Sequence, residues 1–144
     1  MSTQNLKNHT RINPLYHYGL YIILLIGLAF SIWGFVRAYH QHSGRIVAAT
    51  LVTLAVALTL IAYFTRSFSL VVQDRSIRAE ENLRHFVLTG KLLNSHLTIK
   101  QIIALRFAED VEFIQLAEKA VKENLSPAAI KKEIVNWKAD EYRV

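Results

Sequence analysis

Two uncharged apolar stretches decide the fold: YGLYIILLIGLAFSIWGFV at residues 18–36 and IVAATLVTLAVALTLIAYF at residues 46–64. An α-helix needs about 20 apolar residues to cross the hydrocarbon core of a bilayer, and each stretch has that length. Backbone groups in lipid must find hydrogen-bond partners within their own segment, which a helix provides. The sequence therefore predicts transmembrane helices over residues 18–39 and 46–65, in preference to a buried hairpin of a soluble domain.

The expected outer loop at residues 40–45 is short, so the two helices must be antiparallel neighbours. Lys and Arg residues near the ends of membrane spans accumulate on the cytoplasmic side. Both termini are therefore expected in the cytoplasm, with residues 1–17 forming an N-terminal cytoplasmic or interfacial segment. The loop is flanked by Arg37 and Arg45, whereas the other side has Lys7, Arg11, Arg66, Arg75, Arg78 and Arg84.

The composition restricts the classes of function. Of the 144 residues, 52% are hydrophobic and 19% are charged, and the first acidic residue is Asp74. The positive charge of the membrane half suits contact with anionic lipid headgroups. Nucleic acid is not an expected partner, because the basic residues are scattered and accompany no binding motif. The chain has no cysteine, which excludes disulfides, thiolate catalysis and Cys-ligated metal centres.

Small residues recur at four-residue spacing in both predicted spans. Such spacing lets helix backbones approach closely in a membrane. The pattern serves either packing of the hairpin within one chain or assembly of several copies, and it is compatible with both. The predicted packing residues are Gly27, Ser31 and Gly34 in the first span and Ala49, Thr53 and Ala57 in the second.

The second helix is expected to continue as a cytoplasmic stalk over residues 66–90, because Gly90 is the first helix breaker and suits a C-cap. Glu80 and Arg84 are spaced for an ion pair along this helix. Apolar or small residues alternate at spacings of four and three, as in a short coiled coil. We expect this stripe to pack on the following helices or on a second copy. Its members are Val72, Ser76, Ala79, Leu83 and Phe86.

Residues 97–144 are expected to form a hairpin of two amphipathic helices, which completes an all-α fold. Thr98 and Gln101 make a capping box for the first helix, and Ser126 followed by Pro127 starts the second. The two apolar faces are predicted to pack on each other, on the stalk or on a neighbour. The faces are Ile99, Ile103, Phe107, Val111, Ile114, Ala117 and Val121, and then Ile130, Ile134 and Trp137.

Three strings resemble a family of small two-span bacterial membrane proteins of unknown function: QNLKNHTRINP at 4–14, IKQIIALRFAEDVEF at 99–113 and IKKEIVNWKADEYRV at 130–144. The resemblance covers essentially the whole chain. It implies a bacterial inner membrane and a shared architecture, and it implies no catalytic residue. This chain has fewer acidic residues after LRFA than the family pattern. Some related proteins carry a transporter-permease label, but two spans are too few for a complete permease.

The histidines do not predict a metal site. A protein metal centre needs three or four ligands at the correct geometry. His40 and His42 in the outer loop, and His9 and His17 near the inner interface, have no carboxylate at helical spacing. No metal or cofactor is therefore expected, unless an oligomer gathers copies of the loop histidines.

Arg106, Glu109 and Asp110 form the densest charged group of the chain. Carboxylates beside an arginine are able to carry acid–base chemistry. However, Glu109 and Asp110 point in different directions on a helix, and Arg106 is spaced to pair with either. We interpret the group as a salt-bridged face and not as a catalytic site.

Neither apolar stretch contains an ionisable residue of the kind that proton-coupled transporters place at membrane depth. The glycine pattern includes no phosphate-binding loop either. The sequence favours a non-enzymatic scaffold or accessory subunit that assembles with itself or with a larger membrane complex. A homo-oligomeric channel is the alternative, because two-span subunits enclose a pore only as a ring. A membrane enzyme is a further alternative that no motif supports.

Overall fold

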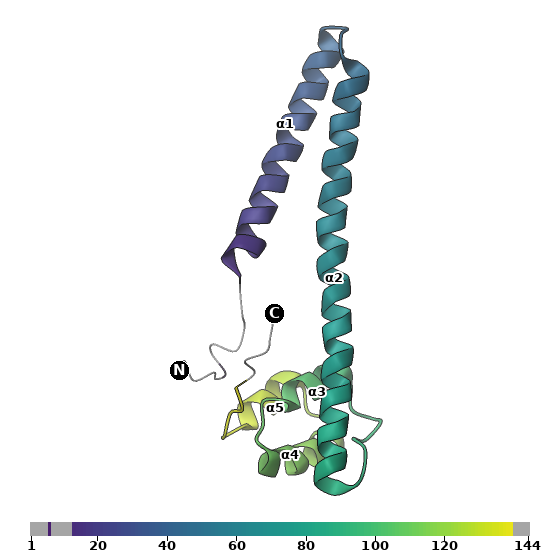
Figure 1. The fold of residues 1–144 in the computed structure, drawn as a ribbon. Helices are drawn as coiled ribbons and strands as arrows, with labels where there is room; N and C mark the ends of the chain where they lie inside the picture. The colour runs from purple at the N-terminus through teal and green to yellow at the C-terminus, as the bar shows by residue number, and fades with distance from the viewer. Residues whose placement is uncertain (1–5, 7–12, 140–144) are drawn as a thin grey trace. The chain divides into compact units, whose positions relative to one another are not determined.

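The computed structural model describes Leu6 and residues 13–139, and helices dominate this part of the chain (Figure 1). The predicted all-α fold is confirmed, including a second long helix that continues far beyond its apolar stretch. The elements are a π-helical turn η1 (Leu15–Leu20), α1 (Tyr21–His40), α2 (Arg45–Thr89), α3 (Ile99–Leu105), α4 (Asp110–Lys122) and α5 (Pro127–Glu133). The chain divides into two compact units, Ile12–Ser69 and one that contains the residues from Leu70 onward.

The first unit is a helical hairpin. It contains the helix Leu15–His40 and the first part of the helix Arg45–Thr89, and both helices are long and apolar enough to cross a membrane. The turn between them needs two left-handed residues, His42 at φ 54° and Gly44 at φ 68°, and glycine adopts this conformation at no steric cost. Arg45 secures the turn, because its guanidinium donates to the Tyr39 carbonyl at 3.1 Å and lies 4.7 Å from the Tyr39 ring centroid.

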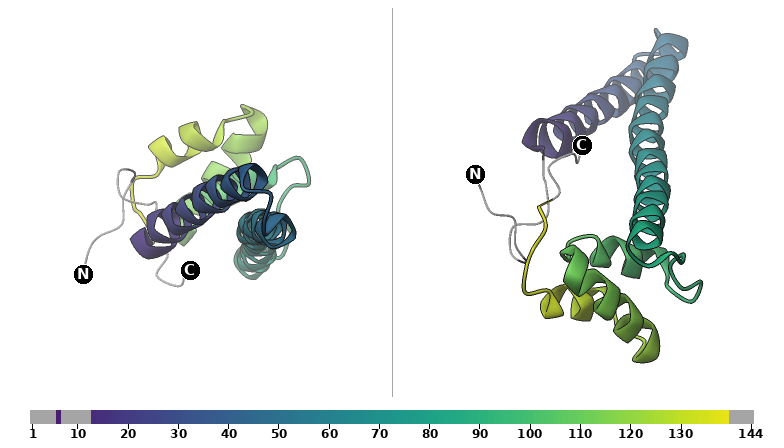
Figure 2. Two further views of the ribbon diagram at one scale, coloured as in Figure 1. Left: turned by 90° about the horizontal axis from the view of Figure 1, so that it is seen from above. Right: turned by 60° about the horizontal axis from the view of Figure 1, so that its bottom comes forward.

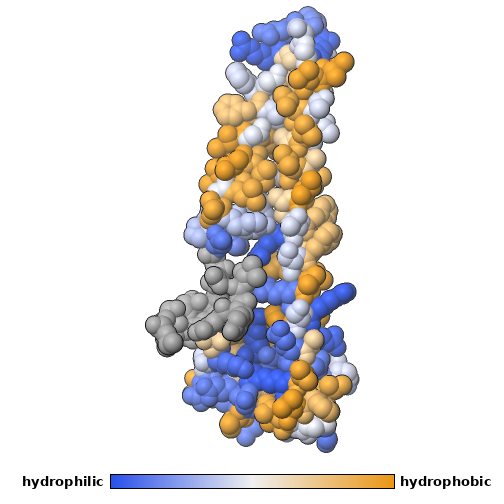
Figure 3. All heavy atoms as spheres, in the orientation of Figure 1, coloured by the Kyte–Doolittle hydropathy of each residue, from blue (hydrophilic) through white to orange (hydrophobic). Residues whose placement is uncertain are grey.

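Apolar side chains of the hairpin lie on its outside. None of the described residues between 13 and 69 is buried, and large side chains such as Ile23 and Phe30 are about two-thirds exposed. Figure 3 shows hydrophobic residues, in orange, over both helices of this unit. Helices that face lipid are expected to have this distribution, because the hydrocarbon is as apolar as the side chains.

The second unit has a conventional buried core. We call residues 70–89 of α2 the stalk and residues 91–139 the C-terminal domain. Figure 2 shows α3, α4 and α5 gathered beside the stalk end of α2. The core is made of apolar side chains from all three short helices and from the loop before α3. Its buried members include Leu93, Leu97, Ile102, Leu105, Phe107, Phe113, Leu116, Ala120, Ile130 and Ile134.

Local caps define where the short helices begin. The capping box of α3 is confirmed: the Thr98 hydroxyl accepts from the Gln101 backbone N–H at 3.3 Å, and the Gln101 side chain accepts from the Thr98 N–H at 2.8 Å. The Ser126 hydroxyl likewise accepts from the Ala129 N–H at 3.2 Å, with Pro127 at the first helical position. The stalk ends as predicted, with Gly90 in the left-handed region at φ 73°.

The prediction of two helices after the stalk is wrong, because three form. The expected first helix is interrupted between Leu105 and Asp110. This interruption turns the buried Phe107 into the core and starts α4 with two carboxylates in its first turn, Asp110 and Glu112. Acidic residues at that place are favoured by the helix dipole. Val111, which was predicted on the apolar face, is 80% exposed.

The expected last helix is also shorter than predicted. Helix α5 ends at Glu133, and Ile134 has an extended backbone. Trp137 therefore lies outside the helix and pairs with Ala108 in an isolated antiparallel bridge. The Lys138 N–H donates to the Phe107 carbonyl at 2.8 Å, and the Phe107 and Trp137 rings lie 5.1 Å apart. The interruption before α4 thus provides the backbone groups that hold the segment after α5.

Candidate functional site

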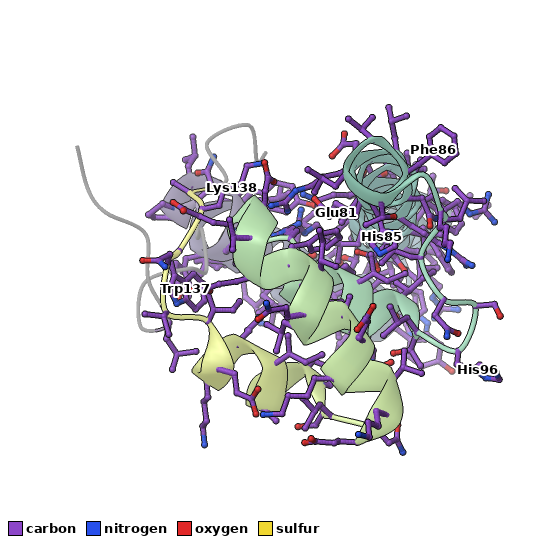
Figure 4. The ribbon with its side chains drawn as sticks, turned by 90° about the horizontal axis from the view of Figure 1, so that it is seen from below. Glu81, His85, Phe86, His96, Trp137 and Lys138 are labelled. Carbon is purple, nitrogen blue, oxygen red and sulfur yellow. The ribbon has the colours of Figure 1, made fainter. Side chains whose placement is uncertain are left out.

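The stalk presents two different faces along one helix. Ile77 and Glu81 are buried, and Arg84, which follows on the same side, contacts the C-terminal domain. Figure 4 shows Glu81 and His85 on the side of the stalk that faces the domain, while Phe86 projects from the opposite side. The stalk is therefore attached to its own chain along one face only.

Arg84 is the centre of the junction between the stalk and the domain. Its guanidinium donates to Asp110 Oδ1 at 2.7 Å, to the Ala108 carbonyl at 2.7 Å and to Glu81 Oε2 at 3.0 Å. The guanidinium carbon also lies 4.4 Å from the ring centroid of Phe113. Charge-assisted hydrogen bonds of this kind are stronger than neutral ones. One side chain of the stalk thus contacts both the start of α4 and the core beneath it.

Glu81 shares this junction in an environment that disfavours its charge. Burial raises the pKa of the Glu81 carboxyl above its ordinary value, and the Arg84 guanidinium opposes this shift through attraction and a hydrogen bond. A buried carboxylate is tolerated only with a partner that compensates for lost hydration. The buried Glu81 carboxylate therefore needs Arg84 to compensate its charge, whereas Arg84 also has Asp110 and the Ala108 carbonyl as partners.

The predicted cluster of Arg106, Glu109 and Asp110 does not form as expected. Asp110 pairs with Arg84 at 2.6 Å and not with Arg106. Arg106 is buried, and its guanidinium carbon lies 4.6 Å from the Phe107 ring centroid. Glu109 is exposed at the N-cap position of α4. The three residues are separated by the interruption between α3 and α4, which the continuous-helix prediction did not contain.

Sequence reasoning also gave Arg84 the wrong partner. The spacing of Glu80 and Arg84 predicted an i,i+4 pair, but Arg84 pairs with Glu81 and Asp110. The i,i+3 spacing of Glu81 and Arg84 was a signal for the first of these pairs. The Asp110 pair joins residues 26 positions apart, and no local pattern indicates it.

Glu112 is a further structural residue that sequence reasoning missed. Its carboxylate accepts from the Val135 N–H at 3.2 Å, from the Asn136 N–H at 3.1 Å and from the Asn136 side-chain amide at 2.9 Å. Lys119 and Glu133 form a second link between α4 and α5 at 2.9 Å. The Glu112 carboxylate thus holds the segment after α5 on α4, and the Glu133 carboxylate holds α5 on α4.

The predicted stripe of the stalk faces away from the C-terminal domain. Val72, Leu83 and Phe86 are 63%, 62% and 50% exposed, and Ser76 and Ala79 are exposed as well. Two other residues predicted for this interface lie elsewhere, in the domain core: Phe107 is buried and Trp137 is half-buried. The following helices therefore do not cover the stripe, although they were one of its two expected partners.

The predicted packing residues of the spans have mixed exposure. A side chain added at Gly27 or Gly34 would meet no atom within 4 Å, so the hairpin itself does not require glycine at these positions. Their role in assembly stays a prediction. Ser31, Gly34, Ala49 and Ala57 are half-buried, while Gly27 and Thr53 are exposed.

The second unit also contains an open cleft of about 410 Å³. His85 and Glu118 contribute polar groups to it, and Leu93 and Leu97 contribute apolar walls. The His85 ring is held in place, because its Nδ1 donates to the Lys91 carbonyl at 2.7 Å. Among the described residues, no group of three or more His, Cys, Asp or Glu side chains could hold a metal ion.

The histidines of the loop and the N-terminal region are separate from this cleft. The His42 ring contacts the Arg45 guanidinium within the turn. His17 Nδ1 lies 2.9 Å from the Asn13 carbonyl, one helical turn earlier in the chain. His9, Lys7 and Arg11 lie outside the described residues. His42 is thus engaged locally, and the gathering of the loop histidines by an oligomer stays a prediction.

Comparisons with known proteins identify a family but no activity. The model of DUF6526, described as a family of unknown function, matches residues 1–144. No curated protein and no solved structure matches the chain.

Proposed function

Because the chain belongs to the family of unknown function DUF6526, we propose its role from its geometry: it is a non-enzymatic membrane scaffold or accessory subunit. The observation that carries the proposal is the stalk. Helix α2 is one uninterrupted helix from an apolar stretch to the C-terminal domain, and the domain covers only one of the stalk's faces. The opposite face stays available to other molecules.

We further propose that the hairpin crosses the bacterial inner membrane with both termini in the cytoplasm. The support is the excess of Lys and Arg on the side of the stalk, and two helices of sufficient length and hydropathy. The same basic residues suit anionic headgroups of the cytoplasmic leaflet. In this arrangement the stalk and the C-terminal domain face the cytoplasm.

The charged residues of the second unit support a structural role in place of a catalytic one. Arg84 and Asp110 contact each other, and Glu112 accepts backbone hydrogen bonds from the segment after α5. A catalytic acid or base needs to reach a substrate proton, whereas these groups are occupied by contacts within the chain. Assembly through the exposed face of the stalk explains why apolar residues lie on that face, which catalysis at these carboxylates would not explain.

The orientation is tested by labelling single cysteines, because the natural chain has none. Ser43 lies in the turn of the hairpin and Ser95 in the loop before α3, and both are exposed. In intact spheroplasts, a membrane-impermeant maleimide should label Ser43→Cys at once and Ser95→Cys only after permeabilisation. The reverse order of labelling would contradict the proposed orientation.

The scaffold role is tested by the mass of the full-length protein in a mild detergent and by cross-linking in native membranes. We expect a particle that contains several copies of the chain, or the chain with another membrane protein. A monomer in detergent that also cross-links to nothing in native membranes would contradict the proposal.

A further inference from the structure

The exposed stripe of the stalk has the geometry of a coiled-coil seam. Val72, Ser76, Ala79, Leu83 and Phe86 alternate at spacings of four and three, which places them at d, a, d, a and d of consecutive heptads. The residues that face the C-terminal domain then fall at the back of the helix. Ile77 and Arg84 take b positions and Glu81 takes an f position, so the domain leaves the a/d face open.

The seam leaves apolar side chains exposed in a unit that has a buried apolar core. Val72, Leu83 and Phe86 are all at least half exposed, although the same unit buries Phe107 and Phe113 almost completely. The stripe also lies beyond the apolar stretch at residues 46–64, among charged neighbours. A contiguous exposed apolar patch on such a surface marks an interaction site.

Charges beside the seam identify the partner. Arg75 takes a g position and Glu80 the following e position, and in a parallel two-stranded coiled coil these positions face each other across the interface. Two identical chains would therefore form the Arg75–Glu80 pair twice by symmetry. Both side chains are exposed, and neither forms an ion pair within residues 13–139. The neighbouring e and g positions, Gln73 and Asn82, are neutral.

We propose that the stalk binds the stalk of a second copy of this chain through the seam, as a short parallel coiled coil. The proposal rests on the proposed function, because it names the partner of the scaffold. Two copies inserted in one membrane with the same orientation have parallel stalks, as the charge pattern requires. In an antiparallel pair, g faces g and e faces e, so Arg75 and Glu80 would lie on opposite sides of the interface and could not pair.

Small residues in the middle of the seam determine how closely the two helices approach. Ser76 and Ala79 occupy consecutive a and d positions, between Val72 on one side and Leu83 on the other. Small side chains at a seam allow close helix contact, and larger ones fill the space on either side. Ala79 is therefore the position at which a cysteine should meet its symmetry mate most directly.

The test uses disulfide formation between single cysteines in native membranes. Ala79→Cys should form a disulfide-linked dimer on mild oxidation. Arg78→Cys is the matched control, since Arg78 is also exposed and occupies the adjacent c position, away from the seam. We expect the dimer yield at Ala79→Cys to exceed that at Arg78→Cys by at least about fivefold.

A charge exchange tests the partner and its direction. In the Ala79→Cys background, Arg75→Glu should reduce the cross-link, and so should Glu80→Arg, because each change places like charges opposite one another. The double exchange should restore the cross-link. A disulfide between differently tagged copies shows that both strands are this chain.

The outcomes separate this inference from the proposed function. Equal cross-linking at Ala79→Cys and Arg78→Cys, or no rescue by the double exchange, overturns the seam even if the protein remains oligomeric by mass. A seam that is overturned in an oligomer leaves the scaffold role intact, with contacts in the membrane spans. A monomer without neighbours overturns both.

Discussion

The hairpin and the second unit place their apolar residues in opposite ways. Between residues 13 and 69 no described side chain is buried, although this region is the most apolar in the chain. In the second unit, Phe107, Phe113 and Ile130 are almost completely buried. The difference follows from the proposed surroundings, because lipid accepts apolar side chains and water expels them.

The seam of the stalk belongs to neither pattern. Its apolar residues lie in the unit that buries such residues, yet they are exposed as in the hairpin. An apolar stripe that stays exposed on a unit with a buried core marks a site of interaction with a partner. The stripe therefore stands out because it is exposed within the unit that has the buried core.

The comparison is tested most strongly by removing the same type of side chain from each unit. Phe113→Ala should lower the free energy of unfolding of the C-terminal domain by about 3–5 kcal/mol, because a fully buried ring leaves a cavity. Phe30→Ala should leave that value nearly unchanged, since Phe30 is 65% exposed in the hairpin. Urea titration of the full-length protein in micelles, followed by Trp137 fluorescence in a Trp33→Phe background, measures both. Equal losses would refute the distinction.

Removal of Arg84 sharpens the comparison at the junction. Arg84→Ala leaves Glu81 buried without its compensating charge, so we expect a loss of about 3 kcal/mol in the same titration. Arg78→Ala is the control, because Arg78 is exposed on the same helix and surface changes of this kind stay within about 0.5 kcal/mol. If the two variants lost the same stability, Arg84 would not be the centre of the junction.

The smallest expected effect is the contribution of Glu81 to the pH dependence of the free energy of unfolding. Burial raises the pKa of Glu81 in the folded state above 4.5, so the folded protein binds this proton more tightly than the unfolded chain does. The associated stability is complete below pH 4.5 and is lost as the pH rises through the raised pKa.

Glu81→Gln should remove this component of the pH dependence, so that stability falls less as the pH rises through that window. Glu118→Gln, on the exposed side of α4, is the control and should retain the wild-type slope. An unchanged slope in Glu81→Gln would show that burial of this carboxyl does not affect folding.

The elements that the sequence predicts best are those set by local chemistry. The two apolar stretches, the capping box at Thr98, the Ser126–Pro127 start and the Gly90 end each depend on residues within a few positions. Such signals act before any tertiary contact forms. They were therefore readable from the sequence, and the structure confirms them.

The elements that the sequence misses depend on contacts between distant residues. Ile103 and Phe107 are spaced for one helical face, so nothing local revealed that α3 ends before Phe107 and that the next helix starts only at Asp110. The bridge between Ala108 and Trp137 supplies the backbone partners that make the interruption possible. A carboxylate such as Glu81 reads as a solvent-facing residue, and only the Arg84 contact explains its burial.

The stalk also shows why an apolar pattern alone does not assign an interface. Val72, Leu83 and Phe86 gave the stronger periodic signal, but the chain's own domain contacts Arg84 on another face of the helix, beside the buried Glu81. The Arg84 contacts compensate for the sparse apolar residues on that face. The pattern thus indicated an apolar stripe that the structure leaves exposed, and the partner of this stripe stays a prediction.

The Arg84 junction also has a consequence for the order of folding. Arg84 and Asp110 are 26 residues apart in the chain, and closing a loop of that length costs on the order of 3 kcal/mol in chain entropy. Contacts within each helix form over shorter separations and therefore faster. The junction is therefore expected to close after the stalk and the short helices have formed, so that Arg84 joins two pieces of structure that already exist.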